Sequence, residues 1–226
     1  MEVIIKDIDM ELNSMGTTDK KTVTIKRKTS ESEITFKLSR GARKKDYKKG
    51  IRTPLQFFNH MLETISWRAC LNLAVDVALD DFKLTHVICE DVGLCAGEAF
   101  LMLFERECAG GVNGSGAAYS CIDEALARTA ISFEGRALLT LSDNLTSGSE
   151  LVEDMQTADL VSFLEGFTQG ARATLHIDLI RGVNPHHVWE AVFRSLGESL
   201  RIAFAPCPWR EGTTPGVKGN VVLEKD

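Results

Sequence analysis

The alternation of apolar and polar residues predicts a set of strands and helices in the first half of the chain. Short segments that alternate with a period of two are typical of half-buried strands. A segment that starts at a proline and repeats its apolar residues every three or four positions is typical of an amphipathic helix, and a second, longer helix follows. The predicted strands are Thr22–Lys28, Glu33–Leu38 and Leu71–Leu79. The predicted helices are Pro54–Cys70, before the third strand, and Glu90–Glu107, after it.

The second half of the chain has the same pattern. Its predicted strands are Ala117–Ile122, Ala130–Phe133, Ala137–Leu141 and Thr174–Ile180. Its predicted helices are Asp159–Ala171, before the last strand, and Pro185–Phe204, after it. Each half therefore has the order strands, helix, strand, helix, and an internal repeat of this length predicts two packed half-domains. We expect an irregular arm at 1–20, a first half-domain at 21–113 and a second at 114–226.

Composition places the chain among ordinary globular proteins. It has 226 residues, of which 44% are hydrophobic and 26% are charged. The net charge of −6 gives it no general attraction for nucleic acids. Apolar runs stay shorter than the roughly 18 residues that cross a bilayer, and the N-terminus lacks the features of a signal peptide. We therefore expect a cytoplasmic protein with neither nucleic acid nor membrane as a partner.

The cysteines and one basic segment have simple interpretations. Six cysteines are scattered without a CxxC pair, and we expect reduced, buried thiols. The basic run Arg43–Lys49 precedes Gly50. It is interpreted as a solvated loop, with an anion site as the alternative.

Two histidine–glutamate pairs are the main chemical signal. His86 stands four residues before Glu90, and His186 stands four residues before Glu190. Residues four apart lie on one face of a helix, so each pair can bind one cation, and imidazole with carboxylate suits manganese, zinc or iron(II). One such pair also arises by chance or as a surface salt bridge. Two pairs at matching positions of a repeat indicate metal binding.

The other three histidines are interpreted by their positions. His187 points about 100° away from His186 on the same helix and is available to a second cation. His60 lies on another predicted helix and is a third candidate ligand. His176 lies in the middle of a predicted strand, where an ordinary strand histidine is expected.

Several sequence motifs resemble those of the imidazoleglycerol-phosphate dehydratase family and occur in the same order. The resemblance extends from about Thr22 to Leu223. They are FNHML at 58–62, HVICEDVG at 86–93, DEALAR at 123–128 and GVNPHHVWEAVF at 182–193. The resemblance implies an α+β fold of two tandem ribosomal-S5-domain-2-like half-domains, with helices packed between two sheets. It also implies a metal-dependent dehydratase, a hydro-lyase of histidine biosynthesis that acts on a small phosphorylated substrate.

The resemblance implies cofactors, partners and site residues as well. Two manganese ions would bind at each active site between the subunits of a homo-oligomer, a trimer or a 24-mer. The implied ligands are His60, His186 and Glu190 for one ion, and His86, Glu90 and His187 for the other. The implied acid–base residues are Glu31, Glu90 and Glu190, and the implied phosphate-binding residues are Arg136 and Lys218.

Four positions depart from the family pattern. Val87 and Ser162 stand where the family has metal-binding histidines, so each metal site keeps three ligands. Gly114 and Gly216 stand where it has an arginine and a serine of the substrate pocket. The alternative hypothesis is therefore a non-catalytic homologue that kept the fold and assembly but lost turnover. A nucleic-acid module is disfavoured by the acidic balance.

Overall fold

The computed structural model describes residues 22–79, 84–147, 150–214 and 216. The predicted arm at 1–20 and the predicted phosphate-binding Lys218 lie outside the described residues. None of the helices in the described ranges is long and apolar enough to cross a membrane.

The first half of the chain forms a four-stranded sheet with the order β1-β2-β4-β3. The β1, β2 and β4 strands pair antiparallel, and the two-residue β3 joins β4 in parallel. The strands are β1 (Thr22–Lys28), β2 (Ser32–Ser39), β3 (Ile51–Arg52) and β4 (Asn72–Leu79). The helices are the 3-10 helix η1 (Tyr47–Gly50), α1 (Gln56–Ala69) and α2 (Thr85–Cys108).

The second half forms a second four-stranded sheet with the order β5-β6-β10-β7. Its strands are β5 (Ser115–Ile122), β6 (Ala125–Ser132), β7 (Leu138–Leu141) and β10 (Thr174–Arg181). Its helices are α3 (Asp143–Thr146), α4 (Thr157–Ala171), α5 (Pro185–Ala203) and the 3-10 helix η2 (Pro208–Arg210). A small hairpin of β8 (Leu151–Val152) and β9 (Met155–Gln156) precedes α4.

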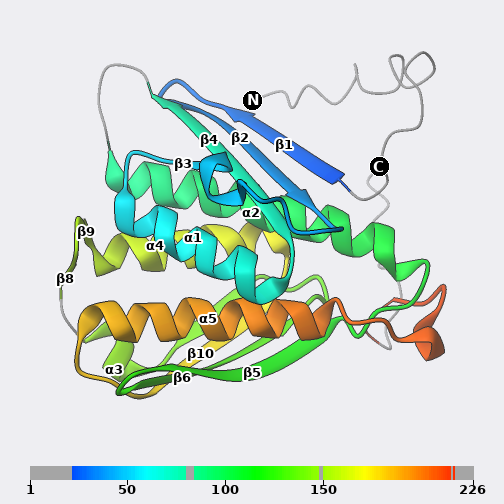
Figure 1. The fold of residues 1–226 in the computed structure, drawn as a ribbon. Helices are drawn as coiled ribbons and strands as arrows, with labels where there is room; N and C mark the ends of the chain where they lie inside the picture. Colours follow the sequence, from blue (N-terminus) through cyan, green and yellow to red (C-terminus); the bar gives the residue numbers. More distant parts are fainter. Residues whose placement is uncertain (1–21, 80–83, 148–149, 215, 217–226) are drawn as a thin grey trace, which may run out of the picture.

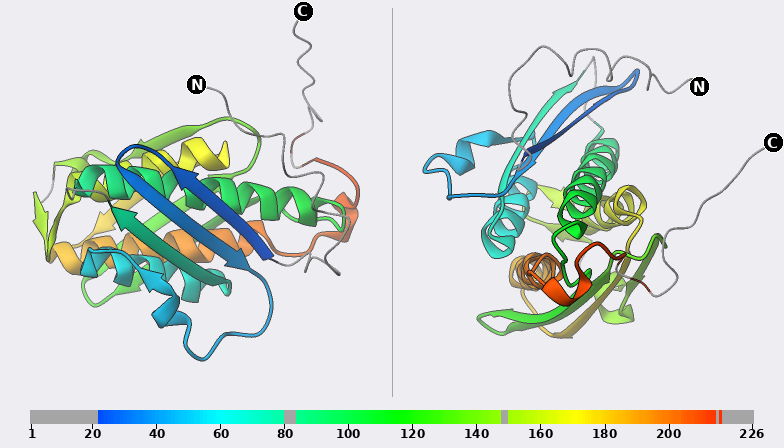
Figure 2. Two further views of the ribbon diagram at one scale, coloured as in Figure 1. Left: turned by 90° about the horizontal axis from the view of Figure 1, so that it is seen from above. Right: turned by 90° about the vertical axis from the view of Figure 1, so that its right-hand side faces the viewer.

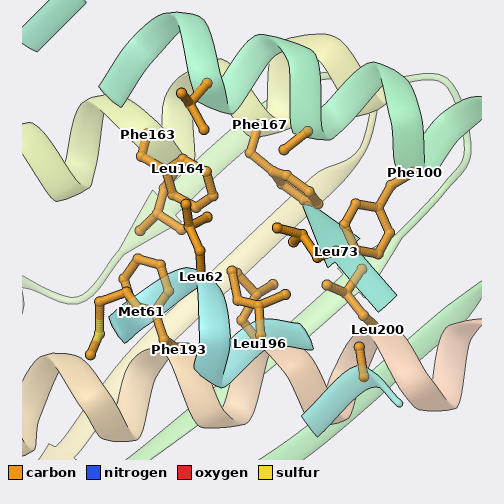
Figure 3. Close-up of a cluster of buried hydrophobic side chains, with 14 of the residues drawn as sticks. Met61, Leu62, Leu73, Phe100, Phe163, Leu164, Phe167, Phe193, Leu196 and Leu200 are labelled. Atoms are coloured by element: carbon orange, nitrogen blue, oxygen red, sulfur yellow. The ribbon is translucent and has the colours of Figure 1, made fainter. Parts of the chain in front are cut away.

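The two sheets have corresponding strand orders, and the long helices lie between them (Figures 1 and 2). In this correspondence α1 matches α4 and α2 matches α5. Each sheet covers the helices with its apolar face, and the helices pack on one another across the halves. The core between them contains Leu62 of α1, Phe100 of α2, Phe167 of α4 and Leu196 of α5 (Figure 3). The predicted α+β class with helices between two sheets is confirmed.

Close contact between α2 and α4 depends on glycines. A Cβ atom on Gly166 would lie 2.4 Å from the carbonyl oxygen of Glu90, and one on Gly97 would lie 2.2 Å from that of Phe167. Both distances are far shorter than an ordinary contact, so a side chain at either position would push the helices apart. The approach of these backbones brings the start of α2 beside α4.

Two predicted boundaries are wrong. Helix α2 begins at Thr85 instead of Glu90, so His86 and Glu90 belong to one continuous helix. Strand β6 begins at Ala125 instead of Ala130, because it pairs with β5 from Ala125 onward. In both places tertiary packing extends an element whose sequence pattern starts later.

The cysteines are free, as expected, but only two of the six are buried. Cys89 and Cys95 are buried, and burial raises the pKa of the Cys95 thiol to about 12. Cys70 is exposed at the end of α1, where it caps the helix in the left-handed conformation with φ 56°. Cys121 is exposed on the edge strand β5. The expectation of buried thiols is therefore wrong at these two positions, and Cys108 and Cys207 are only partly buried.

Candidate metal centre

Three predicted metal ligands meet where the N-terminal parts of α1 and α5 lie side by side. The Nε2 atom of His60 lies 3.2 Å from Oε2 of Glu190, and Nε2 of His186 lies 3.3 Å from the same oxygen. The ligand atoms of the three side chains all lie within 4.8 Å of one another. No second group of this kind occurs in the part of the chain that the structure describes. Two imidazoles and one carboxylate fit a manganese, zinc or iron(II) ion.

The carboxylate of Glu190 is oriented by Arg194. The side chain of Glu190 is only 8% exposed, and Arg194 donates hydrogen bonds of 2.9 and 2.6 Å to its Oε1. This leaves Oε2 to face the two histidines. Burial raises the pKa of Glu190, but the hydrogen bonds from Arg194 and His60 outweigh it and the pKa is lowered overall. The carboxylate therefore stays ionised and ready for a cation.

The start of α5 is set by its local sequence. The side chain of Asn184 caps the helix by accepting a hydrogen bond of 2.9 Å from the backbone N–H of His186. Pro185 occupies the first turn, where its missing N–H costs nothing. This start places His186 and His187 in the first turn. The rings of Phe57 and His186 pack edge to face, with their centres 5.1 Å apart.

The turn between β8 and β9 fixes both helices of the centre. Oε1 of Glu153 lies 2.8 Å from Nδ1 of His186, so it orients the ring whose Nε2 faces Glu190. The next residue, Asp154, accepts hydrogen bonds from the backbone N–H groups of Gln56 and Phe57 at 2.7 and 3.0 Å. The sequence pattern indicates neither carboxylate, because each acts on a helix distant along the chain.

The corresponding place between α2 and α4 has a poorer set of ligands. Nε2 of His86 lies 3.6 Å from Oε2 of Glu90. Ser162 takes the position that His60 occupies in the first centre, and its Oγ lies 3.0 Å from Nδ1 of His86. Ser162 also donates to the carbonyl oxygen of Ala158. This half-centre thus has one imidazole where the first has two.

Within one chain, His187 does not contact His86 or Glu90 and pairs with two carboxylates on the β5–β6 turn instead. Its Nδ1 lies 2.7 Å from Oε2 of Glu124, and its Nε2 lies 3.4 Å from Oδ2 of Asp123. Glu124 also accepts from the backbone N–H of Asn184 at 2.9 Å. These hydrogen bonds from Asn184 and His187 lower the pKa of Glu124 to about 2. The hydrogen bond to Glu124 in turn raises the pKa of His187.

The predicted acid–base residue Glu31 is exposed in the turn between β1 and β2. That turn is tied to α2 by the buried Asp91, which follows Glu90. Asp91 accepts from Oγ of Ser32 and from Nε of Arg27, both at 2.9 Å. The turn that carries Glu31 is therefore held near the α2 half-centre.

The remaining candidates belong to the second half of the chain, on strands or in the segments beside them. Arg136 is exposed and forms an ion pair of 3.0 Å with Glu134. A Cβ on Gly216 would lie 3.5 Å from the same Glu134 carboxylate, so Gly216 lies close to the ion-pair partner of Arg136. Gly114 has φ +74°, a conformation that favours glycine. His176 is exposed on β10.

Fold and site define a class: an α+β protein of two corresponding halves, with a histidine–carboxylate centre where a helix of each half meets the other. The family model described as imidazoleglycerol-phosphate dehydratase matches residues 53–200, which include all the predicted metal ligands and Arg136. The chain belongs to the imidazoleglycerol-phosphate dehydratase family, whose members are dehydratases and thus lyases. The resemblance found in the sequence is confirmed.

Individual relatives agree with this assignment. The chain is 33% identical over 204 residues to the imidazoleglycerol-phosphate dehydratase of Acidovorax sp., covering 89% of this chain and 92% of that protein. It is 31% identical over 202 residues to that of Methylococcus capsulatus, with 89% and 98% covered.

Solved structures of the family share the fold. The Staphylococcus aureus enzyme matches with a TM-score of 0.69 and 27% identity, covering 82% of this chain and 99% of that one. The Pyrococcus furiosus enzyme, solved in complex with (S)-C348, matches with a TM-score of 0.71 and 25% identity, with 87% and 100% covered.

Proposed function

We propose that the chain is a metal-dependent dehydratase of histidine biosynthesis that acts on imidazoleglycerol phosphate. The observation that carries the proposal is the cluster of His60, His186 and Glu190, whose ligand atoms lie within 4.8 Å of one another in a chain of this family. The donor set suits a divalent ion of the manganese class. When bound, such an ion supplies a Lewis acid that polarises the substrate.

The chain's own groups supply orientation and proton transfer. Arg194 and Glu153 fix the carboxylate of Glu190 and the ring of His186, so little reorganisation is needed on binding. Loss of a hydroxyl as water requires a base for the carbon-bound proton and an acid for the leaving oxygen. Glu31 and Glu90 are the candidates for these steps. Arg136 is the described candidate for the phosphate.

The second metal site is proposed to need another copy of the chain. Within one chain, His187 pairs with Glu124 and does not join His86 and Glu90. An assembly in which His187 of one copy approaches that pair on another would complete three ligands. This supports the trimer or 24-mer that the resemblance implies. The cytoplasmic location and the division at residues 113 and 114 stay predictions.

One observation favours the alternative of a homologue without turnover. Ser162 replaces a histidine at the α2–α4 half-centre and has its hydroxyl committed to His86 and Ala158. The retained cluster at the α1–α5 centre, with its supporting Arg194 and Glu153, favours a metal-binding protein in either case.

Metal titration and a turnover assay separate these hypotheses. We expect manganese binding by calorimetry, with loss of at least tenfold in affinity for His60→Ala and Glu190→Gln, because each removes a ligand. The exposed strand residue His176 provides the matched control, and His176→Ala should bind as the unmodified protein does. Formation of the dehydrated product from imidazoleglycerol phosphate supports the enzyme. Metal binding without turnover supports the alternative, and equal metal affinity in all variants refutes the site.

A further inference from the structure

A cavity of about 350 Å³ lies at the far end of the α1–α5 pair from the metal centre. It is open to solvent and is lined by the loop before η1, Tyr47 of η1, the last turn of α1, the start of β4 and Arg201 of α5. Trp67, which lines it, lies seven residues after His60 on α1, or about 10 Å along the helix axis. The volume falls in the range of small-molecule sites.

One wall of the cavity is aromatic. The rings of Tyr47 and Trp67 lie 6.0 Å apart and are tilted by 33°. The guanidinium of Arg43 lies 5.5 Å from the centre of the Trp67 ring and 5.9 Å from that of Tyr47. Trp67 is 55% exposed, which is unusual for so large an apolar side chain. Its exposed ring offers a surface on which a flat ring can stack.

The cavity is also positively charged. Arg43, Arg68 and Arg201 line it, and Arg68 is paired with Glu198 at 2.8 Å. In the described ranges, no ion pair engages Arg43 or Arg201. Residues 40–52 contain seven lysines and arginines against one aspartate, in a chain whose net charge is −6. The positive charge is therefore concentrated on this part of an otherwise acidic protein.

The loop that carries Arg43 is anchored. The buried side chain of Asn72 accepts from the backbone N–H of Lys44 at 2.9 Å and donates to the carbonyl oxygen of Ala42 at 3.1 Å. Asn72 thus holds the loop on both sides of Arg43 against the start of β4. A preformed wall loses little freedom on binding, which is the property of a binding site more than of a solvated loop.

We propose that this cavity binds a small anion with a flat ring, of the class of a nucleoside monophosphate. The base would stack on Trp67, and the phosphate would lie between the guanidinium groups of Arg43 and Arg201. An inorganic anion would leave the aromatic wall unused, and an uncharged ring would leave the arginines unused. The site is separate from the metal centre and does not depend on the function proposed for it.

Two exposed cysteines provide an internal readout for the test. Cys70 lines the cavity, whereas Cys121 lies on β5 outside it. The native protein is alkylated with iodoacetamide in the presence of AMP, adenosine or inorganic phosphate, and the labelled peptides are quantified by mass spectrometry. We expect AMP to slow labelling of Cys70 and to leave Cys121 unchanged. Adenosine and phosphate at the same concentration should protect Cys70 less.

Variants locate the bound ligand. Arg43→Ala and Arg201→Ala should each weaken AMP binding by about tenfold, the usual effect of removing one charged hydrogen-bond donor. Arg52→Ala is the matched control, since Arg52 lies just beyond the basic loop, pairs with Asp76 and does not line the cavity. It should bind AMP as the unmodified protein does.

Four outcomes would overturn the proposal. One is the absence of Cys70 protection by AMP at millimolar concentration, and another is protection by phosphate equal to that by AMP. A third is AMP binding that disappears in His60→Ala but persists in the arginine variants, which would place the nucleotide at the metal centre. The fourth is a Cys70 that resists labelling without any ligand, which would mean that a neighbouring copy closes the cavity.

Discussion

Removal of the Asp154 carboxylate should destabilise the protein by loosening the start of α1. Asp154 accepts hydrogen bonds from the first two N–H groups of this helix, those of Gln56 and Phe57. The residue at the N-cap position is Leu55, whose side chain has no acceptor. Asp154, from the other half of the chain, therefore caps this helix, and the Asp154→Ala substitution removes the cap.

The magnitude follows from these contacts. Loss of a capping acceptor costs about 1 kcal/mol, and loss of a negative charge at a helix N-terminus costs about 0.3–1 kcal/mol. Because Asp154 is exposed, solvent screening favours the lower end. We expect the free energy of unfolding to fall by about 1–1.5 kcal/mol, and Tm to fall by about 2–6 °C for a chain of this size.

Urea unfolding measures the change. The slope of the free energy with urea should stay constant while the midpoint moves, because the same surface is exposed on unfolding. Asp154→Asn is the graded control, because its amide keeps one of the two oxygens that accept from Gln56 and Phe57. It loses the charge and one of the two hydrogen bonds, so it should cost less than Asp154→Ala. An Asp154→Ala protein as stable as the unmodified one would refute the capping argument.

The neighbouring residue tests the same turn through metal binding. Glu153 contacts His186 and no backbone N–H of α1. Glu153→Gln should therefore leave the unfolding free energy within about 0.5 kcal/mol, as exposed substitutions usually do. It should weaken manganese binding by about tenfold, because it removes the carboxylate that orients a ligand. Equal loss of stability in both variants would show that the turn acts as one unit.

Three further changes test other parts of the site. Glu124→Gln should return the raised pKa of His187 toward its ordinary value in an NMR titration, so the neutral, metal-binding form of the ring appears at lower pH; an unchanged titration would contradict the pairing. Ser162→His should tighten manganese binding at the α2–α4 half-centre by about ten- to a hundredfold in calorimetry, and unchanged affinity would contradict the correspondence of the two halves. Gly166→Ala should lower the unfolding free energy by about 1–3 kcal/mol in urea, whereas Gly110→Ala, whose added Cβ has its nearest neighbour at 3.7 Å, should change it little; equal effects would contradict the close packing.

The fold was largely predictable because apolar residues repeat along its helices and strands with the periods typical of each. The strands with alternating residues were found, and so was the correspondence of the two halves. The start of α2 was missed because Thr85–Cys89 contains β-branched residues that weaken the helical pattern. It becomes helical because its apolar residues pack into the core, which includes the fully buried Ile88.

The site was predictable only in part, and the division has a physical reason. A histidine and a glutamate four residues apart on a helix lie on the same face, so spacing alone predicts that His186 and Glu190 are paired. The carboxylates that orient the histidines come from turns 33 and 63 residues away in sequence, at Glu153 and Glu124. No local pattern encodes such a contact, because the packing of the two halves creates it.

The α1–α5 centre and the corresponding α2–α4 place differ in how deeply their side chains are buried, although the two halves have corresponding folds. At the α1–α5 centre Glu190 is 8% exposed and held by Arg194, whereas at the α2–α4 place the side chain of Glu90 is 44% exposed and that of His86 is 62% exposed. Burial strengthens the attraction of a carboxylate for a cation, and solvent weakens it. In the proposed metal-binding function, a single chain would therefore hold one ion more firmly than the other. The second ion would depend on groups that another copy supplies, and metal binding and assembly would then be coupled.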